Sequence, residues 1–233
     1  MPSLKVMLAK SLPQPILNKI LLRFPSFYRN DFVNYESYLD RENGIPELLN
    51  KFEEALAVEG DVIECGCARA GTSVIMGTRI EGARKEKTVY ALDTFDGFDK
   101  GEIEKEVQAG NVPDYSDHDF KYNSYEYVQQ KLKRLGLTKR VIPVKGLFQD
   151  TMKEIRAESY CFGFIDCDLE DSLLFATREV WKKLSHGGII MMDDYNSDQY
   201  RGVTKAVDKL VKEFGSNVKE HKFLKRLYYI KKA

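Results

Sequence analysis

After Gly60 the chain alternates short, continuously apolar segments with longer amphipathic ones, and this alternation limits the possible folds more than any other feature. The apolar segments of strand length lie at residues 61–65, 88–93, 140–145, 160–166 and 188–193. Helical patterns separate them, at residues 72–80, 125–135, from about 148, 172–184 and 202–214. Strands that are apolar on both faces must be covered on both faces, so the pattern predicts a doubly wound α/β domain with a mostly parallel sheet.

The C-terminal end departs from this alternation. Two short β-like stretches, at about residues 218–223 and 226–230, have no helix between them and predict an antiparallel hairpin at one edge of the sheet. The expected sheet therefore has seven strands in a Rossmann-like arrangement. Residues 97–123 are expected to form a long polar loop.

Residues 1–56 are expected to form an N-terminal helical arm or lid, followed by one domain at residues 57–233. From Ser3 to about Phe27 the pattern is apolar with spaced Lys and Arg residues, and two prolines interrupt it. A basic amphipathic segment of this kind can lie on a membrane surface, or it can pack on the domain or on a second subunit. We favour packing, because an isolated helix of this length is marginal in water, and expect a homodimer or a higher homo-oligomer.

Composition argues against several classes of function. Lys plus Arg and Asp plus Glu both total 36, so the chain lacks the basic excess of a nucleic-acid-binding domain. Its apolar runs are too short to cross a bilayer, and the N-terminus has no apolar signal-peptide core. No histidine stands near the cysteines to complete a zinc set, and all four are expected to be buried: Cys65, Cys67, Cys161 and Cys167. We expect a cytoplasmic protein.

A glycine-containing turn follows the first expected strand. In the sequence ECGCARAGT, Gly66 and Gly71 allow the backbone to fold tightly and approach a ligand, and Thr72 or Ser73 can cap the next helix. The turn lacks the GxGxxG spacing that pyrophosphate binding prefers, which weakens NAD or FAD as ligands without excluding them.

Asp93 ends the second expected strand, where a carboxylate can accept hydrogen bonds from both ribose hydroxyls of NAD or of S-adenosylmethionine. Its alternative role is a helix cap or a solvated strand end. Glu64 separates the two cofactors, because a carboxylate beside the turn repels a pyrophosphate and tolerates the amino-acid end of S-adenosylmethionine. These residues favour the methyl donor, and an NAD-dependent oxidoreductase is the alternative function.

Carboxylates also end the fourth and fifth expected strands. Asp166 and the pair Asp193 and Asp194 are expected to converge if these strands are neighbours, since the carboxyl ends of parallel strands share one edge. Carboxylates without a His or Cys partner suit a hard cation such as Mg²⁺, Mn²⁺ or Ca²⁺. Acids that only cap the following helix are expected at Asp168, Glu170 and Asp171.

Residues 166–172 (DCDLEDS) and, after a helix, residues 187–195 (GGIIMMDDY) resemble the macrocin O-methyltransferase family. The other motifs of that family are similar to residues 64–71, 93–97 and 145–151. The resemblance covers about residues 35–214. It implies a class I methyltransferase fold, S-adenosylmethionine as the methyl donor, and a magnesium ion that binds the hydroxyls of the acceptor.

The resemblance also implies roles for single residues. Asp166, Asp193 and Asp194 match the acids that hold the metal. The residues expected to bind the cofactor are Glu64, Gly66, Ala68, Gly71, Thr72, Asp93, Phe95, Gly146, Phe148 and Asp166. The loop at 97–123 and the segment before Asn30 depart from the members that act on antibiotic sugars, so a hydroxylated small molecule is implied and a macrolide is not.

The expected reaction transfers a methyl group from S-adenosylmethionine to a hydroxyl oxygen. Asp166 is expected to serve both as a metal ligand and as the general base. His118 is a second candidate base, and its alternative is a solvated loop position. The aromatic residues around it could close a lid over the acceptor or pack against the sheet edge: Tyr115, Phe120, Tyr122 and Tyr125.

Overall fold

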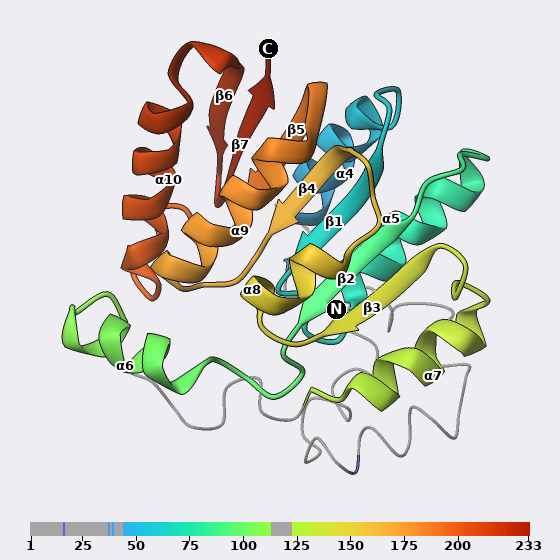
Figure 1. Ribbon diagram of the computed structural model, residues 1–233, viewed down its shortest axis with the longest axis horizontal. Coiled ribbons are helices and arrows are strands. Elements are labelled where there is room, and N and C mark those ends of the chain that lie inside the picture. The colour runs from blue at the N-terminus through green and yellow to red at the C-terminus, as the bar shows by residue number, and fades with distance from the viewer. Residues whose placement is uncertain (1–15, 17–36, 38, 40–43, 113–122) are drawn as a thin grey trace, which may run out of the picture.

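One seven-stranded sheet forms the centre of the computed structural model, which describes residues 16, 37, 39, 44–112 and 123–233 (Figure 1). The strands are β1 (Asp61–Cys65), β2 (Val89–Asp93), β3 (Val141–Lys145), β4 (Tyr160–Ile165), β5 (Leu184–Met192), β6 (Val218–Leu224) and β7 (Leu227–Lys232). Their order is β3-β2-β1-β4-β5-β7-β6. Strands β1 to β5 pair in parallel, and β7 pairs antiparallel with both β5 and β6. The predicted sheet and its C-terminal hairpin are confirmed.

Helices cover both faces of the sheet, because successive residues of a strand point to opposite faces. In β1, Val62 belongs to the hydrophobic core on one face and Ile63 to the core on the other. Helices α4 (Gly44–Ala55), α5 (Gly71–Gly82) and α7 (Tyr125–Leu135) pack on the Val62 face. The Ile63 face is covered by α6 (Lys100–Gln108), α8 (Phe148–Thr151), α9 (Glu170–Lys183) and α10 (Arg201–Phe214).

Helix α4 shares the core of the sheet, although it was expected within the N-terminal arm. Leu48 and Phe52 are completely buried, and the ring of Phe52 meets the ring of Phe162 in β4 edge-on, with 5.3 Å between the ring centroids. This packing joins α4 to the domain that follows it.

Most of the remaining arm lies outside the described residues, so its structure and the expected homo-oligomer stay predictions. Among the helices that the structure does describe, none is both long enough and apolar enough to cross a membrane.

The prediction of a continuous loop at residues 97–123 is wrong for part of that segment, because α6 occupies its first half. The Asp99 side chain caps this helix by accepting a hydrogen bond from the Glu102 N–H at 3.0 Å. An Asp at the cap with an acid in the first turn is a helix-start signal that the polar composition obscured. Residues 113–122, which include His118, are outside the described residues.

Replacing Phe52 by Ala tests whether α4 belongs to the folded domain. Removing a fully buried ring leaves a cavity and should lower the free energy of unfolding by about 3–5 kcal/mol. Urea denaturation followed by circular dichroism measures this change. Val107→Ala is the control, because its side chain is 46% exposed and should shift stability by less than about 0.5 kcal/mol. Equal effects of the two substitutions would contradict the packing.

Candidate active site

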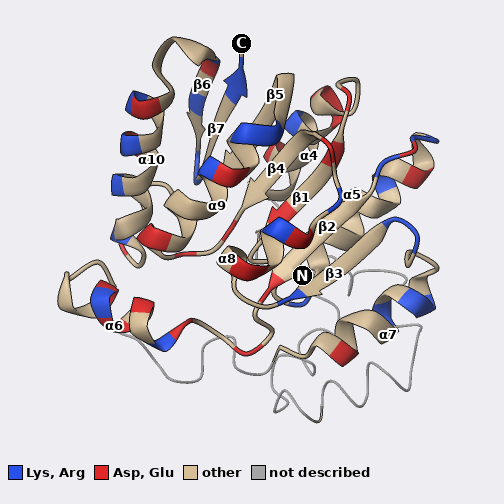
Figure 2. Ribbon diagram, viewed as in Figure 1, with Lys and Arg blue, Asp and Glu red and all other residues tan. Residues whose placement is uncertain are grey.

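The carboxyl ends of the parallel strands open into a cavity of about 520 Å³. Figure 2 shows acidic residues where the chain leaves β2 and β4. The acidic residues that line the cavity are Asp93, Asp99, Glu102, Asp166, Asp168, Asp193 and Asp194. Among the described lining residues, Arg226 is the single basic one. The cavity is therefore strongly acidic, as expected for a site that binds cationic groups.

Asp93 fastens the glycine turn to the loop after β2. One carboxylate oxygen accepts a hydrogen bond from the Ala68 N–H at 2.7 Å, and the other accepts one from the Phe95 N–H, also at 2.7 Å. Burial raises the pKa of Asp93, and these two backbone hydrogen bonds oppose the rise. Asp93 still lines the cavity, and a carboxylate with two accepted hydrogen bonds keeps lone pairs for a ligand.

Gly66 allows the turn after β1 to pass directly against the end of β4. Its φ angle is +88°, and a Cβ at this position would lie 1.9 Å from the carbonyl oxygen of Asp166. No side chain fits there, because the conflict is with backbone. Gly66 and Ala68 both line the cavity, in agreement with the expected location of the turn.

Two of the residues expected to bind the cofactor are turned away from the cavity. Glu64 is 1% exposed and accepts a hydrogen bond from the Ser73 hydroxyl, and burial raises its pKa to about 8. The Thr72 hydroxyl lies 2.7 Å from the hydroxyl of Ser37 and is also buried. Their positions place both residues beneath the turn, where they support it, and their direct contact with the cofactor stays a prediction.

Four more residues expected to bind the cofactor divide into two that line the cavity and two that are buried. Gly146 and Phe148, after β3, line the cavity, whereas Gly71 and Phe95 are buried beneath it. The Phe95 ring packs against Tyr125, with 5.4 Å between ring centroids. For Tyr125, packing is thus what the structure supports, and the other aromatic residues expected in a lid lie outside the described residues.

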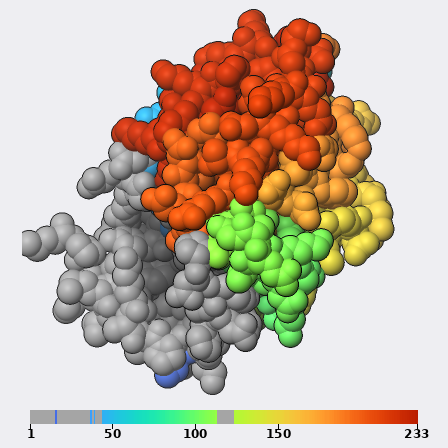
Figure 3. Space-filling view, turned by 90° about the vertical axis from the view of Figure 1, so that its left-hand side faces the viewer, coloured from blue at the N-terminus to red at the C-terminus, as the bar shows by residue number. Residues whose placement is uncertain are grey.

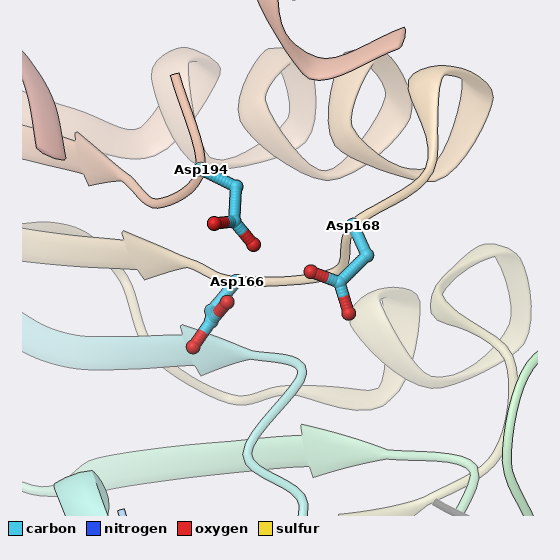
Figure 4. Close-up of side chains that lie close together, drawn as sticks. All are labelled: Asp166, Asp168 and Asp194. Carbon is cyan, nitrogen blue, oxygen red and sulfur yellow. The ribbon is translucent and has the colours of Figure 1, made fainter. Parts of the chain in front are cut away.

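Three carboxylates gather beyond the ends of β4 and β5. Asp166, Asp168 and Asp194 each offer an oxygen that lies within 4.8 Å of the other two (Figure 4). Burial, followed by the neighbouring carboxylates, raises the pKa of both Asp166 and Asp168 well above the usual range. Such a cluster is stabilised by a cation, and its all-oxygen composition suits a hard divalent ion.

This cluster differs by one member from the predicted metal ligands. Asp168 takes the place of Asp193, whose carboxylate is 3% exposed and is bound by the guanidinium of Arg226. The Arg226 Nε donates to Asp193 Oδ1 at 2.6 Å, and Nη2 donates to Asp193 Oδ2 and, at 3.0 Å, to Asp194 Oδ1. Burial raises the pKa of Asp193 to about 6, against the opposing effect of the Arg226 hydrogen bonds.

Backbone conformation explains how Asp168 joins the cluster. Its φ angle is +62°, and that of Asp194 is +55°, which is an unfavourable left-handed conformation for residues other than glycine. Asp is among the residues that tolerate this conformation best. The Asp-Cys-Asp spacing after the strand was a usable signal for Asp168, whereas nothing in the sequence connected Arg226 with the site.

Helix α6 forms one wall of the cavity, and two of its own glutamates bind it to the start of α9. Glu102 accepts hydrogen bonds from both the N–H and the hydroxyl of Ser172, each at 2.6 Å, and Glu106 accepts one from the Glu170 N–H at 3.1 Å. These acceptors satisfy N–H groups at the start of α9, which otherwise lack partners. Figure 3 shows the resulting contact, with α6 in green against the orange and red surface of α9 and α10.

A family model described as Macrocin-O-methyltransferase (TylF) matches residues 45–221. The chain belongs to this family. The match includes β1 to β5 and every described residue of the carboxylate cluster. The family that the motifs resemble is therefore confirmed.

Individual relatives agree with this membership. Mycinamicin III 3''-O-methyltransferase of Micromonospora griseorubida is 28% identical over 147 residues, covering 59% of this chain and 56% of the relative. An O-methyltransferase of Streptomyces olivaceus, named for a rhamnosyl-tetracenomycin, is 26% identical over 148 residues, which cover 62% of this chain and 56% of the relative. The chain thus spans little more than half the length of these relatives.

Solved structures confirm the fold. The O-methyltransferase NovP superposes with a TM-score of 0.68 at 20% identity, covering 95% of this chain and all of NovP. The calicheamicin methyltransferase CalS11 gives a TM-score of 0.65 at 16% identity, covering 97% of this chain and 89% of CalS11.

Replacing Gly66 by Ala tests the close approach of the turn to β4. The new Cβ would clash with the Asp166 carbonyl oxygen at a positive φ, so unfolding free energy should fall by about 2–5 kcal/mol. Gly82→Ala is the control, because its Cβ would meet no atom within 4 Å. The Gly82→Ala substitution should be neutral or slightly stabilising. Thermal melts of both variants measure these changes. Wild-type stability of Gly66→Ala would contradict the geometry.

Proposed function

We propose that the chain transfers a methyl group from S-adenosylmethionine to a hydroxyl oxygen of a small molecule, with the help of Mg²⁺ or Mn²⁺. The observation that carries this proposal is that one cavity joins the Gly66 turn to the carboxylate cluster, with Asp166 at the junction. A methyl donor and an acceptor held by the cluster would then be neighbours, and proximity of this kind lowers the barrier of a two-substrate reaction.

The donor end of the cavity fits an adenosine group. Asp93 presents a carboxylate that two backbone N–H groups hold in place, and it can accept hydrogen bonds from ribose hydroxyls. The cavity wall beside it contains Gly146 and Phe148. A solved structure of SMU.1697c, with a TM-score of 0.52, is described as a complex with SAH. Family membership supports S-adenosylmethionine and does not favour the alternative of an NAD-dependent oxidoreductase.

The cluster end fits a hard cation. Asp166, Asp168 and Asp194 supply only oxygen atoms, and burial raises the pKa of the thiol of Cys167, which lies between Asp166 and Asp168 in the sequence. We assign the cation to these three carboxylates, with Asp193 beside them. When bound, such an ion supplies Lewis-acid activation of an oxygen nucleophile at neutral pH.

Asp166 is the proposed general base, which takes the proton from the hydroxyl group that is methylated. It lines the cavity, and among the three residues of the cluster it is the one whose backbone lies against the Gly66 turn. His118 remains a second candidate from the sequence alone. The acceptor would enter between α6 and the start of α10, where Phe98 and Tyr200 line the wall with 6.4 Å between their ring centroids.

The proposed acceptor is a hydroxylated small molecule. The relatives are named as O-methyltransferases of a rhamnosyl-tetracenomycin, of mycinamicin III and of demethyldecarbamoylnovobiocin, which supports a hydroxylated small molecule as the class of acceptor. A screen of vicinal diols, catechols and sugars, with S-adenosylhomocysteine formation as the readout, tests the reaction directly. Turnover should require Mg²⁺ or Mn²⁺ and stop in EDTA, and full turnover in EDTA would refute the metal-dependent part of the proposal. A cytoplasmic location and a homo-oligomer are retained as predictions from the sequence.

Substitution of Asp93 tests the donor end. Asp93→Ala should weaken S-adenosylhomocysteine binding by about 1–3 kcal/mol, roughly 5–150-fold, because a charge-assisted hydrogen bond is lost. Isothermal titration calorimetry measures the dissociation constant. Asp96→Ala removes an exposed carboxylate from the same loop and should leave it unchanged. Tight binding of NAD by the wild-type protein, without binding of S-adenosylhomocysteine, would overturn the proposed donor.

Substitution of Asp194 tests the cluster end. Asp194→Asn should weaken Mn²⁺ binding at least about tenfold, because it removes one of three charged ligands. S-Adenosylhomocysteine binding should change little, since Asp194 is assigned to the cation. Electron paramagnetic resonance of free Mn²⁺ gives the affinity, and Asp198→Asn, on an exposed side chain, is the control. Unchanged Mn²⁺ affinity of Asp194→Asn would refute the assignment of this ligand.

A further inference from the structure

Arg226 lies at the tip of the hairpin between β6 and β7, far in sequence from the carboxylates that it contacts. Its guanidinium binds Asp193 through both Nε and Nη2, and Nη2 also reaches Asp194 Oδ1 at 3.0 Å. A planar guanidinium that engages a carboxylate through two nitrogens has a fixed orientation as well as a charge. Asp194 is therefore shared between Arg226 and the carboxylate cluster.

The backbone holds Arg226 in this position. The Tyr195 N–H donates to the Arg226 carbonyl oxygen at 3.1 Å, which joins the hairpin tip to the loop that carries Asp194. Beyond this contact, β5 and β7 pair through Met192 and Tyr228. The turn between β6 and β7 thus holds the arginine in place. The side chain of Arg226 is only 33% exposed.

We propose that Arg226 is a positioning residue that acts as a built-in counter-ion: it neutralises Asp193, orients Asp194, and lowers the affinity of the cluster for a divalent cation. This inference rests on the proposed cation site. The guanidinium is the one basic group among the described cavity-lining residues, and it shares a carboxylate with the cluster, so its charge opposes that of an incoming cation. It also limits the mutual repulsion of the buried carboxylates before a cation binds.

The test compares Mn²⁺ affinity in the full chain by electron paramagnetic resonance at constant ionic strength. Arg226→Gln removes the positive charge and should bind Mn²⁺ about tenfold more tightly than the wild type, or more. Without cation its melting temperature should be lower, and saturating Mn²⁺ should restore it. Lys222→Gln is the matched control, because it removes the same charge from an exposed position on the same hairpin and should leave both values unchanged.

Arg226→Lys separates charge from structure. It keeps the positive charge and should bind Mn²⁺ within about threefold of the wild type. Arg226→Met is a second neutral variant, and S-adenosylhomocysteine binding reports whether each protein is folded. If the neutral variants are folded and bind Mn²⁺ no more tightly than the wild type, or if Arg226→Lys binds as tightly as they do, the counter-ion role is refuted. If neither the wild type nor the variants bind Mn²⁺, the proposed cation site fails as well.

Discussion

The hydrogen bond from the Asp193 N–H to the carbonyl oxygen of Ile165, the last residue of β4, continues the pairing of β4 and β5 by one residue beyond the end of β5. The distance between the Asp193 nitrogen and the Ile165 oxygen is 3.0 Å. This hydrogen bond holds Asp193 and Asp194 beside Asp166. Buried carboxylates at adjacent strand ends repel one another, and this cost must be offset by protonation, by a basic side chain or by a bound cation. The structure supplies Arg226 for Asp193, and the remaining carboxylates form the cluster to which we assign the cation.

The type of sheet and the position of the site could be predicted because both depend on local patterns. Continuous apolar segments separated by helices specify a parallel sheet, and ligands of such a sheet bind where the strands end. Gly66 and Asp93 were identifiable for the same reason, since each stands at the end of a strand and each lines the cavity. The metal prediction likewise placed Asp166 and Asp194 correctly beside each other.

The details that the sequence did not reveal depend on contacts between distant residues. Arg226 reaches Asp193 only because β7 inserts between β5 and β6, and no sequence spacing indicates that arrangement. Glu64 was expected to face the cofactor, but strand alternation and the Ser73 hydroxyl hold it in the protein interior. Helix α6 was missed because its mean composition is polar, and its stability depends on carboxylates that bind the start of α9.

The central claim is that one cavity holds both S-adenosylmethionine and a divalent cation. Nuclear magnetic resonance of S-adenosylmethionine labelled with ¹³C in its methyl group, bound to the full chain and titrated with Mn²⁺, tests this claim most directly. A paramagnetic ion in the carboxylate cluster should broaden the bound methyl signal strongly, while the diamagnetic Mg²⁺ should not. A methyl signal that stays sharp when both the donor and Mn²⁺ are bound would contradict a shared cavity.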